Sequence, residues 1–239
     1  MPVVVNEPLD FELKGLDQSH PYLLDRGFSP ETIAYFGLGV AARGSLKGRV
    51  AIPLHDTDGR LIGYAGRQIG DSTVSDNNPR YLFPSNRERE GVVREFRKSD
   101  LAYNASMLKS PAQEVIVVEG FMNLWWLHQN GLTQTVGLIG SECSDRQGEL
   151  LVSLLAPAGR VWILPGGDSI GESWADSILK RLVRERLCRL IRLPEGRQHG
   201  LTDDGYDILT RDLCRLIRLP EGRQPSECKI DELEAWLKQ

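Results

Sequence analysis

Residues 115–118, Val-Ile-Val-Val, are followed at once by Glu119 and Gly120 and then by a helical pattern. Four consecutive β-branched residues predict a strand buried on both faces, as in a parallel sheet that is covered by helices. Gly120 permits a tight turn where this strand ends. We therefore expect Glu119 at the carboxyl edge of an open α/β sheet, which is where such sheets bind ligands.

Three more strands and three helices are predicted after residue 118. The strands are expected over 135–140, 160–164 and 189–194, and the helices over 123–130, 144–155 and 172–186. Strands that alternate with helices predict a parallel, right-handed α/β unit. Asp168 lies in the glycine-rich turn 165–171, so we expect it at the same sheet edge as Glu119.

The amino-terminal part predicts a smaller α+β unit. Two short helices joined at Gly27 are expected over 20–36, the second with Ser29 as its N-cap. A third short helix is expected over 100–105.

A β-hairpin is predicted next to these helices. Two strand-like runs, 48–54 and 61–67, flank an Asp-Gly turn signal. Arg49 and Arg67 lie near the ends of this hairpin. We expect Gly66 to leave room for something to approach the backbone closely.

Charge and composition narrow the class of protein. The net charge is −4, which gives no general argument for nucleic acid, but residues 43–98 carry eleven Arg and Lys residues against seven acids. No stretch resembles a membrane span or a signal peptide, so we expect a cytoplasmic protein without a membrane partner. The four cysteines form no Cys-x-x-Cys pair, so we expect unpaired thiols and no zinc.

An ordered set of motifs resembles a known family. The set comprises Gly48-Arg49, Asp56-x-x-Gly59-Arg60, residues 63–67 (Gly-Tyr-Ala-Gly-Arg), residues 79–82 (Pro-Arg-Tyr-Leu), Lys98, residues 101–103 (Leu-Ala-Tyr) and residues 118–122 (Val-Glu-Gly-Phe-Met). In this order they resemble the catalytic core of bacterial DnaG-type primases, with a Toprim domain that opens at residues 118–122. The resemblance covers roughly residues 20–198.

The resemblance implies a fold and a domain division. It implies a Toprim-like parallel sheet flanked by helices over 111–198, preceded by an α+β subdomain over 1–110. Residues 199–239 would form a carboxy-terminal segment.

The resemblance also implies synthesis of RNA primers on single-stranded DNA from nucleoside triphosphates. Glu119 and Asp168 would be catalytic and would bind Mg²⁺ or Mn²⁺, with Glu221 as a further ligand. Arg49, Arg67, Arg80 and Lys98 would contact the template or the nucleotide. The family's zinc-binding and helicase-interaction modules do not fit in this chain, so a helicase or a separate zinc-binding subunit is an expected partner.

Three positions depart from the family pattern. Gly166 replaces the first aspartate of the loop, Asn123 replaces an acid four residues after the glutamate, and Gln224 replaces a late acid. Two alternatives therefore stay open: a catalytically degenerate nucleic-acid-binding replication subunit of a mobile element, and a Toprim-type nuclease.

Four other conspicuous side chains are predicted to be structural. Trp125 and Trp126 fit a packed helix better than a base-stacking platform, and His55 and His128 are expected not to be ligands.

Residues 187–198 recur unchanged as 213–224. Only one copy can occupy the last strand position of the sheet, and the sequence leaves open which one. A terminal amphipathic helix is expected over 230–237.

Overall fold

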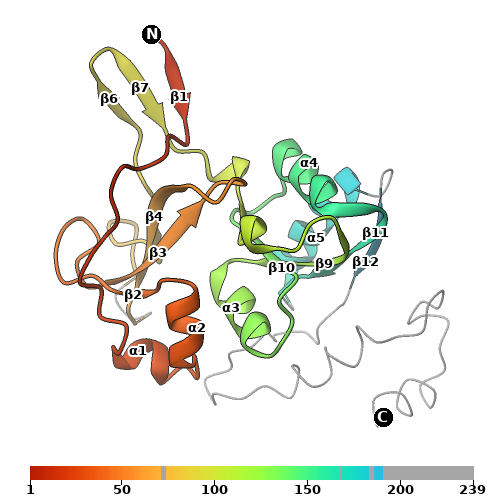
Figure 1. Ribbon diagram of the computed structural model, residues 1–239, viewed down its shortest axis with the longest axis horizontal. Helices are drawn as coiled ribbons and strands as arrows, with labels where there is room; N and C mark the ends of the chain where they lie inside the picture. The colour runs from red at the N-terminus through yellow and green to blue at the C-terminus, as the bar shows by residue number, and fades with distance from the viewer. Residues whose placement is uncertain (71–73, 167, 183–185, 191–239) are drawn as a thin grey trace.

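The computed structural model describes residues 1–70, 74–166, 168–182 and 186–190 (Figure 1). Its largest sheet has five strands in the order β12-β11-β9-β10-β8. These strands are β8 (Ala102–Tyr103), β9 (Ala112–Glu119), β10 (Thr135–Leu138), β11 (Leu155–Leu164) and β12 (Leu187–Leu190). Strands β9 to β12 run parallel, whereas β8 pairs antiparallel with β10. The predicted parallel α/β sheet is thereby confirmed, with an antiparallel edge strand added.

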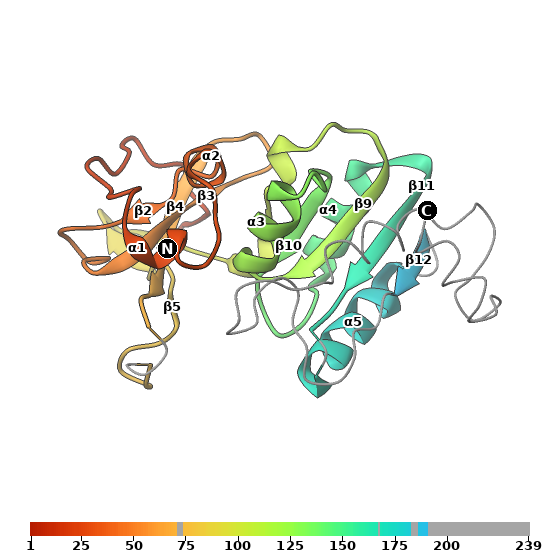
Figure 2. The same cartoon turned by 90° about the horizontal axis from the view of Figure 1, so that it is seen from below.

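Helices cover both faces of this sheet (Figure 2). They are α3 (Phe121–Gln129), α4 (Asp145–Leu154) and α5 (Ser169–Leu182). Ile116 and Val118 point into a core with α3, and Val115 and Val117 point into a second core with α4 and α5. All four side chains are buried. The run at 115–118 therefore forms a central strand with two buried faces, as predicted.

The amino-terminal part contains two short helices and two smaller sheets. The helices are α1 (Pro21–Leu24) and α2 (Pro30–Tyr35). The larger sheet consists of β2 (Gly39–Val40), β3 (Arg49–His55), β4 (Leu61–Gln68) and β5 (Tyr81–Leu82). The smaller sheet consists of β1 (Val3–Val5), β7 (Val92–Glu95) and β6 (Arg87–Arg89). The predicted hairpin is β3 and β4, and Ser29 caps α2 by accepting a hydrogen bond from the Thr32 amide. The smaller sheet projects away from the rest of the chain (Figure 1).

One hydrophobic core joins the amino-terminal part to the parallel sheet. Leu23, Phe28 and Ile52 lie in the same buried cluster as Ile116 and Trp125. Trp125 and Trp126 are both buried, and Phe28 packs edge-on against each ring, so these tryptophans are core residues as predicted. The centre of the His128 ring lies 4.3 Å from the centre of the Tyr35 ring. The domain boundary at residue 110 stays a prediction. Strand β8 lies before this boundary, yet it pairs with β10 of the large sheet.

The helix predicted over 100–105 is wrong. This segment is strand β8, placed between two short 3₁₀ turns, η2 (Lys98–Asp100) and η3 (Ala105–Met107). Gly137 and Leu138 of β10 pair with Tyr103 and Ala102. Long-range pairing with a neighbouring strand thus overrides a weak local helical preference.

The close approach expected at Gly66 is confirmed, and it is made by side chains of this chain. A Cβ at this position would lie 2.6 Å from Leu46 Cδ2 and 3.1 Å from Arg49 Cδ. Side chains of this chain therefore fill the space above the glycine, and no room for a ligand is left there.

The first copy of the repeated segment supplies strand β12. Residues 187–190 pair in parallel with residues 160–163 of β11, which settles the first copy as the one that extends the sheet. The second copy, the helix expected over 230–237 and Glu221 lie outside the described residues. Within the described ranges, no helix has the length and hydrophobicity needed to cross a membrane.

We predict that Gly137→Ala destabilises the fold by about 1–3 kcal/mol, as overpacking of a tight core contact does. A Cβ on Gly137 would lie 2.8 Å from the backbone oxygen of Gly120, which is the turn after Glu119. Urea unfolding followed by tryptophan fluorescence measures the effect. The exposed Thr133→Ala in the preceding loop is the control, with a change within about 0.5 kcal/mol. Equal stability of the two variants would contradict the close contact.

Candidate metal and nucleic-acid site

Strand register brings four segments to one edge of the large sheet. Glu119 at the end of β9 is aligned with Leu138 at the end of β10, and Leu138 is aligned with Ala102 at the start of β8. On the other side of β9, Val118 is aligned with Leu164 at the end of β11. The turn 98–101, the loop 139–144, the Glu119 turn and residues 165, 166 and 168 therefore meet at the carboxyl edge.

Glu119 is held at this edge by the turn at Gly120. Gly120 adopts φ 75° and ψ −169°, and its amide donates to the Leu138 backbone oxygen at 3.2 Å. A positive φ of this kind favours glycine. The Glu119 side chain is partly exposed. Burial, and secondarily the negative charge of Asp168, raise the pKa of Glu119.

Asp168 precedes the first turn of α5 and acts as its cap. Its Oδ1 accepts a hydrogen bond from the Gly171 amide at 2.7 Å, and its backbone oxygen accepts one from the Glu172 amide. The loop packs so closely on the helix that a Cβ on Gly171 would lie 2.2 Å from the Gly166 oxygen. Asp168 is nevertheless exposed, so part of its carboxylate is left for a ligand.

Neither Glu119 nor Asp168 is paired with an arginine or lysine among the described residues. Two carboxylates suit a Mg²⁺ ion that keeps waters and takes further oxygen ligands from substrate phosphates. No cluster of three or more His, Cys, Asp or Glu side chains that could hold a metal ion is found in the described part of the chain.

The departures at Asn123 and Gly166 have different structural meanings. Asn123 Nδ2 donates to the backbone oxygen of Glu119 at 3.0 Å, a bond that an ionised aspartate is unable to make. A Cβ on Gly166 would lie 3.7 Å from Asp168 Oδ1, in ordinary van der Waals contact. A Cβ at position 166 therefore fits beside Asp168. Gln224 and Glu221 lie outside the described residues.

Lys98 lies in the turn that precedes β8, at the same sheet edge. The side chain is exposed, and its Nζ lies 5.4 Å from the centre of the Phe83 ring. A cation over an aromatic face gains electrostatic stabilisation while it stays open to solvent. Its location brings a positive charge to the edge that carries Glu119.

Arg67 is a buried guanidinium between two tyrosines. It is 5% exposed, its Nε donates to the Tyr22 hydroxyl and its Nη1 to the Tyr81 hydroxyl, both at 2.8 Å. Burial by itself lowers the pKa of Arg67, and the tyrosine oxygens outweigh it, so the pKa is raised. The Tyr81 ring also contacts Phe121, the residue after Gly120. Arg67 is thus fixed in its charged form behind the Glu119 turn.

Arg49 is buried by contacts within the protein. Its guanidinium donates to the backbone oxygens of Gly66 and Pro79 and to the Asn78 side-chain oxygen. Arg80, in contrast, is exposed. Of the four predicted basic contacts, Lys98 and Arg80 therefore lie at the surface, whereas Arg49 and Arg67 hold neighbouring segments together.

Sequence analysis missed the residues that hold these cations. Tyr22, Tyr81 and Phe83 contact Arg67 or Lys98 through their hydroxyls or rings. Tyr81 follows Arg80 in the motif of residues 79–82, and this position is the one sequence signal for its role. Tyr22 is 45 residues from Arg67 in the chain, so only the tertiary structure reveals their contact.

Comparison with known proteins finds similarity to primases. No protein-family model matches the chain. The chain is 28% identical over 225 residues to a DNA primase of Pseudomonas putida, with 75% of this chain and 32% of that protein covered. It spans between 21% and 35% of the length of the curated relatives that it matches.

Two solved structures share the fold. One is the Aquifex aeolicus primase with its zinc-binding and RNA polymerase domains: the TM-score is 0.66 at 24% identity, with 82% of this chain and 54% of that chain covered. The other is a DnaG primase catalytic domain bound to single-stranded DNA: the TM-score is 0.61 at 24% identity, with 77% and 66% covered.

We predict that Glu119→Gln raises the melting temperature of the metal-free protein at pH 7. A raised pKa in the folded state means that stability is lost as the pH rises through the folded pKa, and a neutral amide avoids this loss. The difference should vanish below pH 4.5, the ordinary pKa of the group, where wild-type Glu119 is protonated in both states. Thermal denaturation at both pH values tests this.

Thermal denaturation in the presence of Mg²⁺ tests whether Glu119 contributes to metal binding. At pH 7 the ion should raise the melting temperature of the wild type more than that of Glu119→Gln. The matched control is Asp176→Asn, an exposed acid on α5 that should respond like the wild type. A Glu119→Gln protein that is less stable than the wild type at pH 7 would contradict the raised pKa of Glu119.

Proposed function

The chain is related in sequence and in fold to the catalytic core of DnaG-type primases, and on that basis we propose that it is a primase-type nucleotidyltransferase. It joins nucleoside triphosphates into RNA primers on a single-stranded DNA template. The observation that carries the proposal is the pair Glu119 and Asp168, two carboxylates at the carboxyl edge of the sheet without a basic partner among the described residues, in a chain whose curated relatives are DNA primases.

Glu119 and Asp168 are the proposed ligands of a Mg²⁺ or Mn²⁺ ion. When bound, such an ion neutralises phosphate charge and polarises a phosphoryl oxygen. The raised pKa of Glu119 supports this role, because a bound cation would relieve the repulsion between the two acids. Glu221 is proposed as a further ligand on sequence grounds alone.

The basic residues are proposed to bind and orient the substrates. Lys98 and Arg80 are exposed and would contact phosphates directly, in the way that lysine and arginine commonly bind nucleic-acid backbones. Arg67, fixed by Tyr22 and Tyr81, would present one edge of its guanidinium to the nucleotide or template. Arg49 would act mainly by fixing residues 78 and 79, next to Arg80.

A single-stranded DNA partner is supported by the related catalytic domain that was solved with single-stranded DNA. We propose that residues 111–198 carry the metal site and that residues 1–110 guide the strand. Primer synthesis would place the protein with replicating DNA in the cytoplasm.

A second candidate function is a nucleic-acid-binding subunit without catalysis. It is favoured by Gly166, which stands where the family pattern has a second acid of the same loop, and by Asn123, whose amide is engaged with the Glu119 backbone. In that case the chain would bind single strands in a salt-dependent manner and synthesise nothing.

Primer synthesis on single-stranded DNA with labelled ribonucleotides tests the first proposal. Glu119→Gln and Asp168→Asn should each lower the rate by about 100-fold or more, as expected when a group that stabilises the transition state is removed. Asp176→Asn should keep the wild-type rate. Equal product from the wild type and Glu119→Gln would refute the mechanism, and no product from the wild type would favour the binding subunit.

Gly166→Asp should strengthen metal binding. The new carboxylate would lie beside Asp168 and supply a third oxygen ligand, so calorimetry with Mn²⁺ should show affinity higher by about tenfold, or 1.4 kcal/mol. Gly166→Asn has nearly the same size without the charge and should gain much less. Equal affinities for the two variants would show that the metal does not bind next to residue 166.

A further inference from the structure

The turn that carries Lys98 has little stability of its own. It is a single 3₁₀ turn of three residues without a side-chain cap, and Lys98 and Ser99 are exposed. Short 3₁₀ segments have poor hydrogen-bond geometry, and one isolated turn is not stable in water. The position of Lys98 must therefore depend on contacts from another part of the chain.

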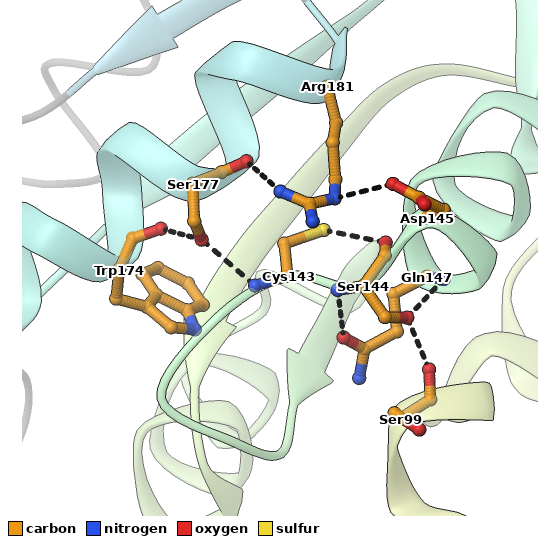
Figure 3. Close-up of polar contacts among 8 residues, drawn as sticks. All are labelled: Ser99, Cys143, Ser144, Asp145, Gln147, Trp174, Ser177 and Arg181. Atoms are coloured by element: carbon orange, nitrogen blue, oxygen red, sulfur yellow. Dashed lines mark hydrogen bonds and ion pairs between the residues drawn. The ribbon is translucent and has the colours of Figure 1, made fainter.

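The first turn of α4 makes these contacts. Gln147 Nε2 donates to the backbone oxygen of Leu101 at 2.9 Å and to that of Lys98 at 3.4 Å. Gln147 is fully buried, and its Oε1 accepts the Ser144 amide at 3.0 Å, so both ends of the amide group are engaged. Ser144 Oγ donates to the backbone oxygen of Ser99 (Figure 3).

The same two residues, Ser144 and Gln147, form the capping box of α4. Ser144 Oγ accepts the Gln147 amide while Gln147 Oε1 accepts the Ser144 amide, which satisfies two donors at the helix start. A capping box needs only the acceptor end of Gln147. The donor end is left to hold residues 98–101, a task that the glutamate common at this position of a capping box could not perform when ionised.

Helix α4 is in turn fixed to α5 (Figure 3). The Cys143 amide donates to Ser177 Oγ at 2.9 Å, and Arg181 Nε donates to Asp145 Oδ1 at 3.1 Å. Because α5 begins at the loop of Asp168, one pair of packed helices fixes both Asp168 and the Lys98 turn.

We infer that Gln147 is a positioning residue for Lys98. Its amide holds the turn 98–101 so that the Lys98 ammonium stays above Phe83 at the carboxyl edge, ready for a phosphate of single-stranded nucleic acid. The inference rests on the proposed function, because it assigns Lys98 a phosphate contact.

A double-mutant cycle in the full chain tests this inference. Affinity for a fluorescently labelled single-stranded DNA oligonucleotide is measured over a range of salt concentrations for the wild type, Lys98→Ala, Gln147→Ala and the double variant. Lys98→Ala should lower the slope of log K against log salt by about 0.7, the value for one phosphate contact on a single strand. Gln147→Ala should weaken binding at least about threefold and lower the slope in the same direction.

The decisive comparison is the double variant. If Gln147 acts through Lys98, adding Gln147→Ala to Lys98→Ala should change the affinity by less than about twofold, because coupled residues are not additive. A loss as large as in the wild-type background would mean that Gln147 supports the fold in general, and no loss in either background would also overturn the inference.

Two more variants separate positioning from helix stability. Gln147→Glu keeps the capping box and loses the donor to residues 98 and 101, so it should weaken binding as Gln147→Ala does. Glu149→Gln removes an exposed charge from α4 and leaves the contacts to residues 98–101 untouched, so it should bind like the wild type.

Thermal denaturation verifies that each variant is folded. Ser144→Ala, which removes the bond to the Ser99 oxygen, replaces the Gln147 variants if they do not fold, and it should show the same dependence on Lys98. Wild-type protein that binds no single-stranded DNA would contradict the proposed function, whereas wild-type binding that is unaffected by Gln147→Ala would contradict the inference alone.

Discussion

The burial of strand β9 on both faces is the constraint on which the rest of the structure depends. Ile116 and Val118 enter the core shared with the amino-terminal part, and Val115 and Val117 enter the core under α4 and α5. A shift of one residue would exchange these two sets, so the register is strongly specified. Because the strand is fixed, Glu119 at its end is fixed, and the parallel neighbours β10 and β11 bring their loops to the same edge.

The two carboxylates at the carboxyl edge of the large sheet lower the stability of the fold. Glu119 is partly buried near Asp168, and neither acid has a basic partner among the described residues. Partly buried carboxylates without a basic partner destabilise a fold. Such destabilising groups are common at functional sites. Arg67 shows the opposite arrangement, since two tyrosine hydroxyls hold its charge in a buried place.

The aromatic residues and α4 connect the basic groups to the acidic ones. Phe121 follows Gly120 directly and contacts Tyr81 and Phe83, the rings on which Arg67 and Lys98 lie. From the other side, Gln147 holds the Lys98 turn. Cations and carboxylates that come from distant parts of the chain are thereby placed around one turn of the backbone.

The sequence by itself determined the parallel sheet, the hairpin and the location of Glu119 and Asp168 at one edge, because periodicity, turn signals and strand ends are local features. It also pointed to the primase core through the order of its motifs. Only the tertiary structure decided that residues 102–103 form a strand, that Leu46 and Arg49 fill the space at Gly66, and that Tyr22, Phe83 and Gln147 hold the basic residues. These features depend on contacts between residues that are 15 to 50 positions apart or on pairing with another strand, and no local pattern encodes such contacts.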